Sequence, residues 1–268
     1  MPVMRTLRSL WAWFSITLLI LIWLPLLALV RLVDRDPAHY HTGRWFRQLG
    51  AAMTRVNPFW DVVLEGERIE DPRRPYVVVC NHQSNVDIPV ISRLPWDMKW
   101  VAKAELFRVP FVGWMMRLAD DIPVDRGEKS SRARVLIRAR EVLEKRCSVM
   151  FFPEGTRSRD GRVYAFNDGA FRLAIKAGVP VLPLAIEGTF DALPKHSWRF
   201  GDPRTIRLKV LPPVATDGLG AGDTAALRDR VRQMIVEQIA AWRGVPVEAV
   251  DALARDEMTA EVKESIKN

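Results

Sequence analysis

The amino-acid sequence predicts an α/β fold, in which a mostly parallel sheet is flanked by helices and preceded by an N-terminal membrane helix or helical hairpin. Three observations support this prediction. An uncharged run opens the chain, short apolar runs alternate with helical patterns from residue 61 onward, and polar residues directly follow two of those runs. Of the 268 residues 49% are hydrophobic, which is enough to build a core.

The opening run is long enough to cross a bilayer. Residues 9–30 carry no charge, and as a helix they would extend about 33 Å, against a hydrocarbon core of roughly 30 Å. Pro25 is expected to kink or divide this helix, so a hairpin that enters one leaflet fits as well as a full span. A cleaved signal peptide is the main rival, but the run is long for one and no small-x-small cleavage site follows.

Positive charge is concentrated around this run. The chain has a net charge of +8, and residues 1–60 hold seven arginines, two acids and five of the ten tryptophans. Arginine and tryptophan beside an apolar run are typical of a membrane interface. At 41–60 an apolar face with interleaved arginines predicts an amphipathic helix on the bilayer, with a surface helix of the soluble domain as the alternative. No nucleic-acid partner is expected, since zinc-finger spacing, RNP-type motifs and Lys-rich runs are lacking.

These patterns divide the chain into a membrane-anchoring segment at 1–60, a globular domain at 61–245 and a C-terminal tail at 246–268. Strands are expected at 62–64, 76–80, 99–102, 148–152, 181–186 and 205–210. Helices are expected at 88–94, 109–119, 130–145, 169–176 and 224–243. Cys80 and Cys147 each adjoin an apolar run, which indicates buried thiols in a reducing compartment, and neither a disulfide nor a metal site is expected.

Polar residues directly follow the expected strand at 76–80, and in α/β folds such strand ends are where sites form. Among them are His82 and Asp87. A histidine can remove the proton of a hydroxyl group, and a carboxylate on its second ring nitrogen fixes the tautomer. The two residues are five apart, so a tight turn must bring them together. The alternative is that Asp87 only caps the helix that follows.

A second polar stretch, Pro-Glu-Gly-Thr-Arg at 153–157, follows the expected strand at 148–152. Gly155 permits a sharp turn and close approach of a ligand. The guanidinium of Arg157 can hold a phosphate through two hydrogen bonds. The alternative is a solvated turn, because charged residues continue beyond it.

Together the two stretches resemble the Asn-His-x4-Asp and Phe-Pro-Glu-Gly-Thr-Arg blocks of the lysophospholipid acyltransferase family, in the same order. The residues at 122–126 are similar to a third block, which usually reads Phe-Ile-Asp-Arg, although Pro123 and Val124 replace its Phe-Ile. Val-Pro-Val-Leu-Pro at 179–183 is similar to the last block. The resemblance spans roughly residues 75–190 and lies closest to the 1-acylglycerol-3-phosphate acyltransferase branch.

The resemblance implies a membrane-bound O-acyltransferase with the globular domain as its catalytic domain, on the cytoplasmic face (of the inner membrane, if bacterial). It would move a fatty acyl group from acyl-CoA or acyl carrier protein to a lysophospholipid, most closely 1-acylglycerol 3-phosphate, giving phosphatidic acid. His82 would be the general base and Asp87 its orienting partner. No metal or cofactor is expected, because a thiolate leaves readily. The residues implied in acceptor binding are Arg126, Arg157, Lys103, Glu154, Gly155 and Thr156.

Other functions stay open at this point. The acceptor can instead be another lysophospholipid, an amino-acid lipid or glycerol 3-phosphate. A membrane-anchored serine hydrolase with Ser84 beside His82 is a second class, although the Gly-x-Ser-x-Gly elbow is absent. A membrane-anchored binding protein that kept the fold without the chemistry is a third.

Overall fold

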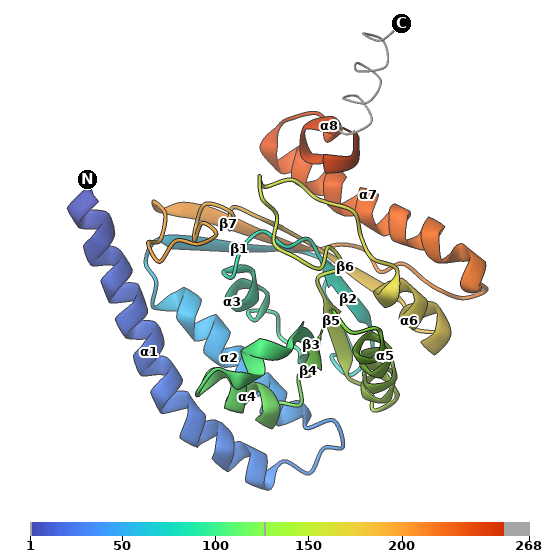
Figure 1. The fold of residues 1–268 in the computed structure, drawn as a ribbon, viewed down its shortest axis with the longest axis horizontal. Helices are drawn as coiled ribbons and strands as arrows, with labels where there is room; N and C mark the ends of the chain where they lie inside the picture. The colour runs from blue at the N-terminus through green and yellow to red at the C-terminus, as the bar shows by residue number, and fades with distance from the viewer. Residues whose placement is uncertain (1, 126, 255–268) are drawn as a thin grey trace, which may run out of the picture.

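The computed structural model describes residues 2–125 and 127–254, which form a seven-stranded sheet with helices on both faces (Figure 1). The strand order across the sheet is β1-β7-β6-β2-β5-β3-β4. The strands are β1 (Trp60–Gly66), β2 (Val77–Cys80), β3 (Met98–Lys103), β4 (Ile122–Val124), β5 (Ser148–Phe151), β6 (Val181–Glu187) and β7 (Arg204–Val210). This confirms the predicted α/β class and its mostly parallel sheet.

Five neighbouring strands, from β6 to β4, are parallel, whereas β7 is antiparallel to β6 and carries β1 parallel beside it. The central strand β2 is fully buried, which explains why its sequence is continuously apolar. The short strand β4 was not predicted. It contains Pro123, which has no N–H to donate, and it is tolerated because β4 lies at the edge of the sheet.

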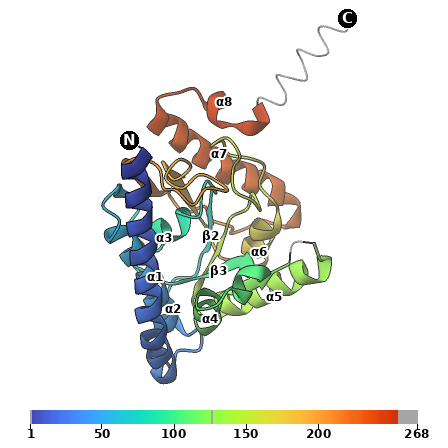
Figure 2. The same ribbon diagram turned by 60° about the vertical axis from the view of Figure 1, so that its left-hand side comes forward.

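Helices form a layer on each side of the sheet (Figures 1 and 2). One layer contains α1 (Pro2–Val33), α2 (Tyr40–Arg55), α3 (Asp87–Ile91), the 3-10 helix η1 (Ala104–Arg108) and α4 (Val112–Leu118). The other contains α5 (Lys129–Glu144), α6 (Gly169–Ala177), the 3-10 turn η2 (Ala221–Asp223), α7 (Thr224–Arg243) and α8 (Val247–Val250). Each layer has its own core, because successive β2 side chains point to opposite faces: Val77 and Val79 to one, Val78 and Cys80 to the other.

Helix α1 is long and apolar enough to cross a membrane, with a mean hydropathy of 2.6 and only 6% of its most apolar window buried. Pro25 does not divide it, since the helix continues to Val33. It lies against the domain along its length: the Arg5 side chain donates to the carbonyl of Phe200 (2.8 Å), and Leu27 is fully buried. Both views show α1 running along the flank of the molecule beside α2 (Figures 1 and 2).

Helix α2 begins as predicted but ends at Arg55, and it packs between α1 and the sheet. Its inward face carries a charge: Arg47 is 4% exposed and donates to Asp121 at 2.6 and 2.7 Å. Nearby, the fully buried Lys99 donates to Asp97 at 2.7 Å. An ionic cluster therefore joins α2 to β3 and to the start of β4.

Both cysteines are buried, as predicted, and burial raises the pKa of the Cys80 and Cys147 thiols. The predicted tail begins with the short helix α8, which is attached to α7 because Arg232 donates to Asp251 at 2.8 Å. The remainder of the predicted tail, 255–268, lies outside the described residues.

Candidate active site

Two loops meet at one edge of the sheet. His82 follows β2, Glu154 follows β5, and these two strands are adjacent and parallel. Their carboxyl ends therefore lie side by side, where α/β folds place their sites. The backbone joins the loops directly, since the N–H of Ser158 donates to the carbonyl of His82 at 2.7 Å.

The turn between β2 and α3 brings His82 and Asp87 together. The Nδ1 atom of His82 lies 2.7 Å from Oδ2 of Asp87, whose side chain is fully buried. The same oxygen accepts the backbone N–H groups of Gln83 (2.7 Å) and Ser84 (3.0 Å). A carboxylate on Nδ1 leaves Nε2 of the imidazole as the nitrogen that can accept a proton.

Asp87 does not cap the helix that follows it. It is the first residue of α3, Val86 occupies the cap position, and the Asp87 carboxylate turns back toward residues 82–84. The interpretation of Asp87 as only a helix cap is therefore wrong for its side chain, which closes the turn around His82.

Phe152 supports the imidazole from one side. The two rings are stacked with centroids 3.9 Å apart and an angle of 15° between their planes. Trp100 packs against Phe152 at 5.8 Å, and the guanidinium of Arg47 lies over the Trp100 ring at 5.5 Å. Phe152 was expected at the end of a buried strand, and its contact with His82 was not predicted. The available signal was an aromatic residue directly before the Pro-Glu-Gly turn.

Glu154 is buried and braces the His82 loop. Its Oε1 accepts the backbone N–H of His82 (2.7 Å), and its Oε2 accepts that of Tyr164 (3.1 Å). Burial raises the pKa of the Glu154 carboxyl to about 8. Both oxygens accept backbone N–H groups of this chain, which favours a structural role, and the acceptor contact implied by the family resemblance stays a prediction.

Gly155 makes the sharp turn that the sequence predicted. Its φ of +74° is in the region that favours glycine, and its N–H donates to the carbonyl of Phe152 at 3.0 Å. That N–H is thus already engaged within the turn. Thr156 is exposed, and the half-buried Arg157 has no ion-pair partner among the described residues.

The remaining predicted site residues differ in their surroundings. Lys103 lies at the carboxyl end of β3, on the same sheet edge, but it is exposed and pairs with Glu105 at 2.8 Å. Arg126 lies outside the described residues. Among the described residues, no group of three or more His, Cys, Asp or Glu side chains converges as metal ligands. The expectation that no cofactor is needed stays a prediction.

Ser84 is placed unfavourably for a hydrolase nucleophile. It is 1% exposed, and its hydroxyl donates to the carbonyl of Leu193 at 2.9 Å. A second residue missed from the sequence is Asn81, whose side chain donates to the carbonyl of Ile186 and accepts its N–H, both at 2.9 Å. Asn81 therefore fixes the end of β2 to β6, just before His82.

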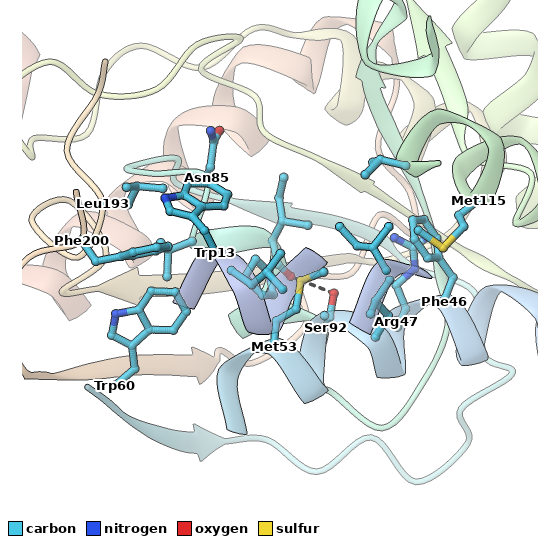
Figure 3. A pocket seen from close by; sticks show the side chains of 18 residues that line it. Trp13, Phe46, Arg47, Met53, Trp60, Asn85, Ser92, Met115, Leu193 and Phe200 are labelled. Carbon is cyan, nitrogen blue, oxygen red and sulfur yellow. Dashed lines mark hydrogen bonds between the residues drawn. The ribbon is translucent and has the colours of Figure 1, made fainter. Parts of the chain in front are cut away.

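An apolar cavity of about 240 Å³ lies between α1, α2 and α3 (Figure 3). Asn85 and Val86, which follow His82 in the same loop, line it. Figure 3 shows Asn85, Trp13 and Leu193 toward one end and Phe46 with Met115 toward the other. The cavity therefore extends from the active-site loop along the helices of the N-terminal pair.

Comparisons with known proteins agree with this geometry. The acyltransferase family model matches residues 61–187. The crystal structure of the 1-acyl-sn-glycerophosphate acyltransferase PlsC from Thermotoga maritima is similar with a TM-score of 0.73 and 30% identity, over 89% of this chain and 98% of that one. The protein thus belongs to the acyltransferase family.

Named relatives make the similarity more specific. The chloroplastic 1-acyl-sn-glycerol-3-phosphate acyltransferase LPAT1 of Arabidopsis thaliana is 35% identical over 67% of this chain and 50% of its own length. The mouse 1-acyl-sn-glycerol-3-phosphate acyltransferase alpha is 37% identical over 65% of this chain and 62% of its own length. The match thus spans about half of the first relative and somewhat more of the second.

Proposed function

We propose that this protein transfers a fatty acyl group from a thioester donor to the free hydroxyl of 1-acylglycerol 3-phosphate, giving phosphatidic acid. The observation that carries the proposal is the buried Asp87 carboxylate, which is 2.7 Å from Nδ1 of His82. The names of the relatives, which are 1-acyl-sn-glycerol-3-phosphate acyltransferases, support this choice of acceptor.

In the proposed reaction Nε2 of His82 takes the proton of the acceptor hydroxyl as its oxygen attacks the thioester carbonyl. The Asp87 carboxylate keeps Nδ1 protonated and stabilises the imidazolium that forms. When the tetrahedral intermediate collapses, the carbon–sulfur bond breaks. The departing sulfur takes the proton back from His82, and the carrier leaves as a thiol. Phe152 and Glu154 act as positioning residues, because they hold the ring and the backbone of His82.

Arg157 supports a phosphate-bearing acceptor. Its guanidinium is half-buried on the loop that contacts His82 and has no acidic partner in the described part of the chain. An arginine without an acid partner can bind a phosphate through two hydrogen bonds and so orient the acceptor. Arg126 is proposed as its partner from the family resemblance alone.

The apolar cavity is proposed to hold an acyl chain. Its walls are the side chains of α1, α2 and α3, and it meets the active-site loop at Asn85 and Val86 (Figure 3). Burying methylene groups there is favourable by about 0.8 kcal/mol each. An acyl chain in this cavity would place its carbonyl end near His82.

The proposed location is a membrane surface, with α1 embedded in one leaflet and the catalytic domain on the cytoplasmic side. The Trp13 indole donates to the carbonyl of Trp198 at 2.7 Å, and Leu27 packs with Leu49 and Met115. Because α1 contacts the domain near both ends, a perpendicular crossing would pull domain residues into hydrocarbon. An in-plane helix keeps the lipid substrate and product within reach of the site.

The test is acyl transfer by the purified full-length protein in detergent, with labelled long-chain acyl donors and a panel of lysophospholipid and glycerol 3-phosphate acceptors. Acyl-CoA and acyl carrier protein donors are run in parallel. We expect transfer to 1-acylglycerol 3-phosphate, and a loss of at least about 10²-fold in His82→Ala, the usual contribution of a general base. His41→Ala, on α2, is the matched control and should keep the rate.

Each alternative has its own outcome in this assay. Transfer to another acceptor would change the substrate and keep the mechanism. Release of free fatty acid alone would identify a hydrolase, and binding of lysolipid without turnover of either donor would identify a binding protein. Near-normal transfer by His82→Ala would rule out this residue as the base.

A further inference from the structure

A second exposed apolar surface lies outside the N-terminal helices, on η1, α4 and the turn between them. Within nine residues it presents Leu106 (41% exposed), Val109 (43%), Phe111 (39%) and Trp114 (48%). Large apolar side chains gathered on one surface mark a contact site, whereas single ones are ordinary. We call residues 104–117 the α4 segment.

The α4 segment is a folded unit in which the exposed rings are held in place. Phe107 is buried beneath it, and a side chain at Gly113 would come within 2.3 Å of the Phe107 carbonyl oxygen. Phe111 has a φ of +62°, which is unfavourable for a bulky residue. The centroid of its ring lies 5.2 Å from that of Trp114, so the two exposed rings form an aromatic pair.

The α4 segment also carries two exposed arginines, Arg108 and Arg117. A cavity of about 350 Å³ next to the α4 segment is lined by Arg108, Arg117 and Arg138. Arg138 is paired with Glu141, but Arg108 and Arg117 are exposed and form no ion pair within the described residues. Asp120 and Asp121 also line the cavity but pair with His39 and Arg47, and Glu105, which attracts Arg108, pairs with Lys103. The cavity therefore offers an anion two guanidinium groups that form no ion pair in the described part of the chain.

The α4 segment is continuous with the apolar N-terminal helix. Met115 and Leu118, on the inner side of α4, pack with Leu27 of α1 and Leu49 of α2. Both ribbon views place α4 beside α2 and the C-terminal half of α1 (Figures 1 and 2). A membrane that holds the outer face of α1 would thus extend to Trp114.

We propose that the α4 segment is a second membrane contact, selective for an anionic leaflet, in which Phe111 and Trp114 enter the interface and Arg108 and Arg117 bind lipid phosphates. Aromatic rings beside arginines suit the headgroup region, and each arginine near an anionic surface adds attraction. The inference rests on the membrane location in the proposed function and is independent of the acyl-transfer reaction. Two contacts with the same leaflet would fix the orientation of the catalytic domain on the bilayer surface.

The test measures depth in the bilayer with the full-length chain. Cys80 and Cys147 are buried, so a dye can be attached selectively to an introduced cysteine. Val109→Cys reports on the α4 segment, Leu18→Cys on the outer face of α1, and Ile137→Cys, 63% exposed on α5, is the control away from both. Each labelled protein is mixed with vesicles of phosphatidylcholine and phosphatidylglycerol that contain a spin-labelled quencher lipid.

We expect quenching at both Val109→Cys and Leu18→Cys, with none at Ile137→Cys. In vesicles of phosphatidylcholine alone, quenching should fall at Val109→Cys and persist at Leu18→Cys. Adding Arg108→Gln and Arg117→Gln to Val109→Cys should abolish the dependence on phosphatidylglycerol. Adding Phe111→Ser and Trp114→Ser should reduce quenching in both kinds of vesicle.

Three results would overturn the proposal. Quenching at Leu18→Cys but not at Val109→Cys would leave α1 as an anchor without this contact. Quenching at neither position would remove the membrane location as well, while saying nothing against the reaction. A blue shift of the Val109→Cys dye without vesicles would show contact with a second copy of the chain in place of lipid.

Discussion

At the scale of residues, His82 is fixed by groups that come from separate parts of the chain. Asp87 holds Nδ1, Phe152 lies against the ring, and Glu154 accepts the backbone N–H. A general base is effective only if its ring is already in place when the hydroxyl arrives. The orientation of His82 is therefore a property of two loops together.

The Glu154 side chain gives a prediction that separates bracing from substrate contact. A carboxyl group, ionised or neutral, can accept both N–H groups, whereas the amide of Glu154→Gln directs its NH₂ at one of them. An unsatisfied buried donor costs about 1–3 kcal/mol, so we expect kcat to fall roughly tenfold with little change in the acceptor KM. Steady-state kinetics check this, with the exposed Glu65→Gln as control. A rise confined to the acceptor KM would restore Glu154 to the acceptor pocket.

Arg157 gives the complementary prediction. Charge-assisted hydrogen bonds contribute about 1.5–3 kcal/mol, so Arg157→Ala should raise the KM for 1-acylglycerol 3-phosphate by roughly ten- to a hundredfold. The donor KM should stay constant, because the proposed role of this guanidinium is to bind the phosphate of the acceptor. Arg159→Ala, exposed two residues further along, is the matched control. Equal effects on both substrates would argue against phosphate binding by Arg157.

The sequence was sufficient to predict the contact between His82 and Asp87, which lie in one loop. His82 and Asp87 are separated by a short polar stretch, so their approach follows from turn chemistry. The stacking of Phe152 on His82 and the hydrogen bond from His82 to Glu154 depend on how β2 and β5 are paired. Local patterns do not encode that register, so Phe152 was missed and Glu154 was given a different role.

At the scale of elements, buried strands and capped helices were predictable, and edge elements were not. The six expected strands and five expected helices of the globular domain all occur, and α6 and α7 end at Gly178 and Gly244 with φ of +63° and +64°. The three-residue strand β4 was not predicted, because Pro123 is unfavourable in a strand. The burial of Arg47 on the inner face of α2 was also not predicted. In the sequence alone an arginine at this position indicates a solvated or lipid-facing charge, and only the fold places Asp121 beside it.

The Arg47 cluster leads to a prediction about α2. Removing one partner of a buried ion pair costs about 3–5 kcal/mol, because the other charge is left buried and unpaired. Arg47→Met should therefore lower the free energy of unfolding by about that amount, measured by chemical denaturation in detergent. Arg55→Met, exposed on the same helix, should change it by no more than about 0.5 kcal/mol. If both variants unfold alike, α2 is not secured through Arg47.

At the scale of the whole molecule, the sheet separates two helical layers that differ in their exposed and internal surfaces. The layer of α5, α6 and α7 covers one core and borders a cavity beside Phe152 and Gly155, whereas the layer of α1 to α4 encloses the apolar cavity and exposes the outer face of α1. His82 follows the carboxyl end of the central strand β2, in the loop whose residues Asn85 and Val86 line the cavity enclosed by α1 to α4. An amphiphilic substrate can thus keep its chain among the helices and its polar end at the loops.

This division predicts how chain length is selected. Figure 3 shows Met53 between the two ends of the cavity, beside Ser92. A larger side chain there should block the passage to the far end of the cavity, which the end of a long acyl chain would occupy. Met53→Trp is therefore expected to lower the ratio of kcat/KM for long-chain over short-chain donors or acceptors, and Met53→Ala to leave or raise that ratio. A missing methylene contact is worth about 0.8 kcal/mol, so each group excluded should change the ratio roughly fourfold. Ile137→Trp, exposed on α5, controls for the added indole. An unchanged ratio in Met53→Trp would mean that the acyl chain lies elsewhere, for instance in the leaflet itself.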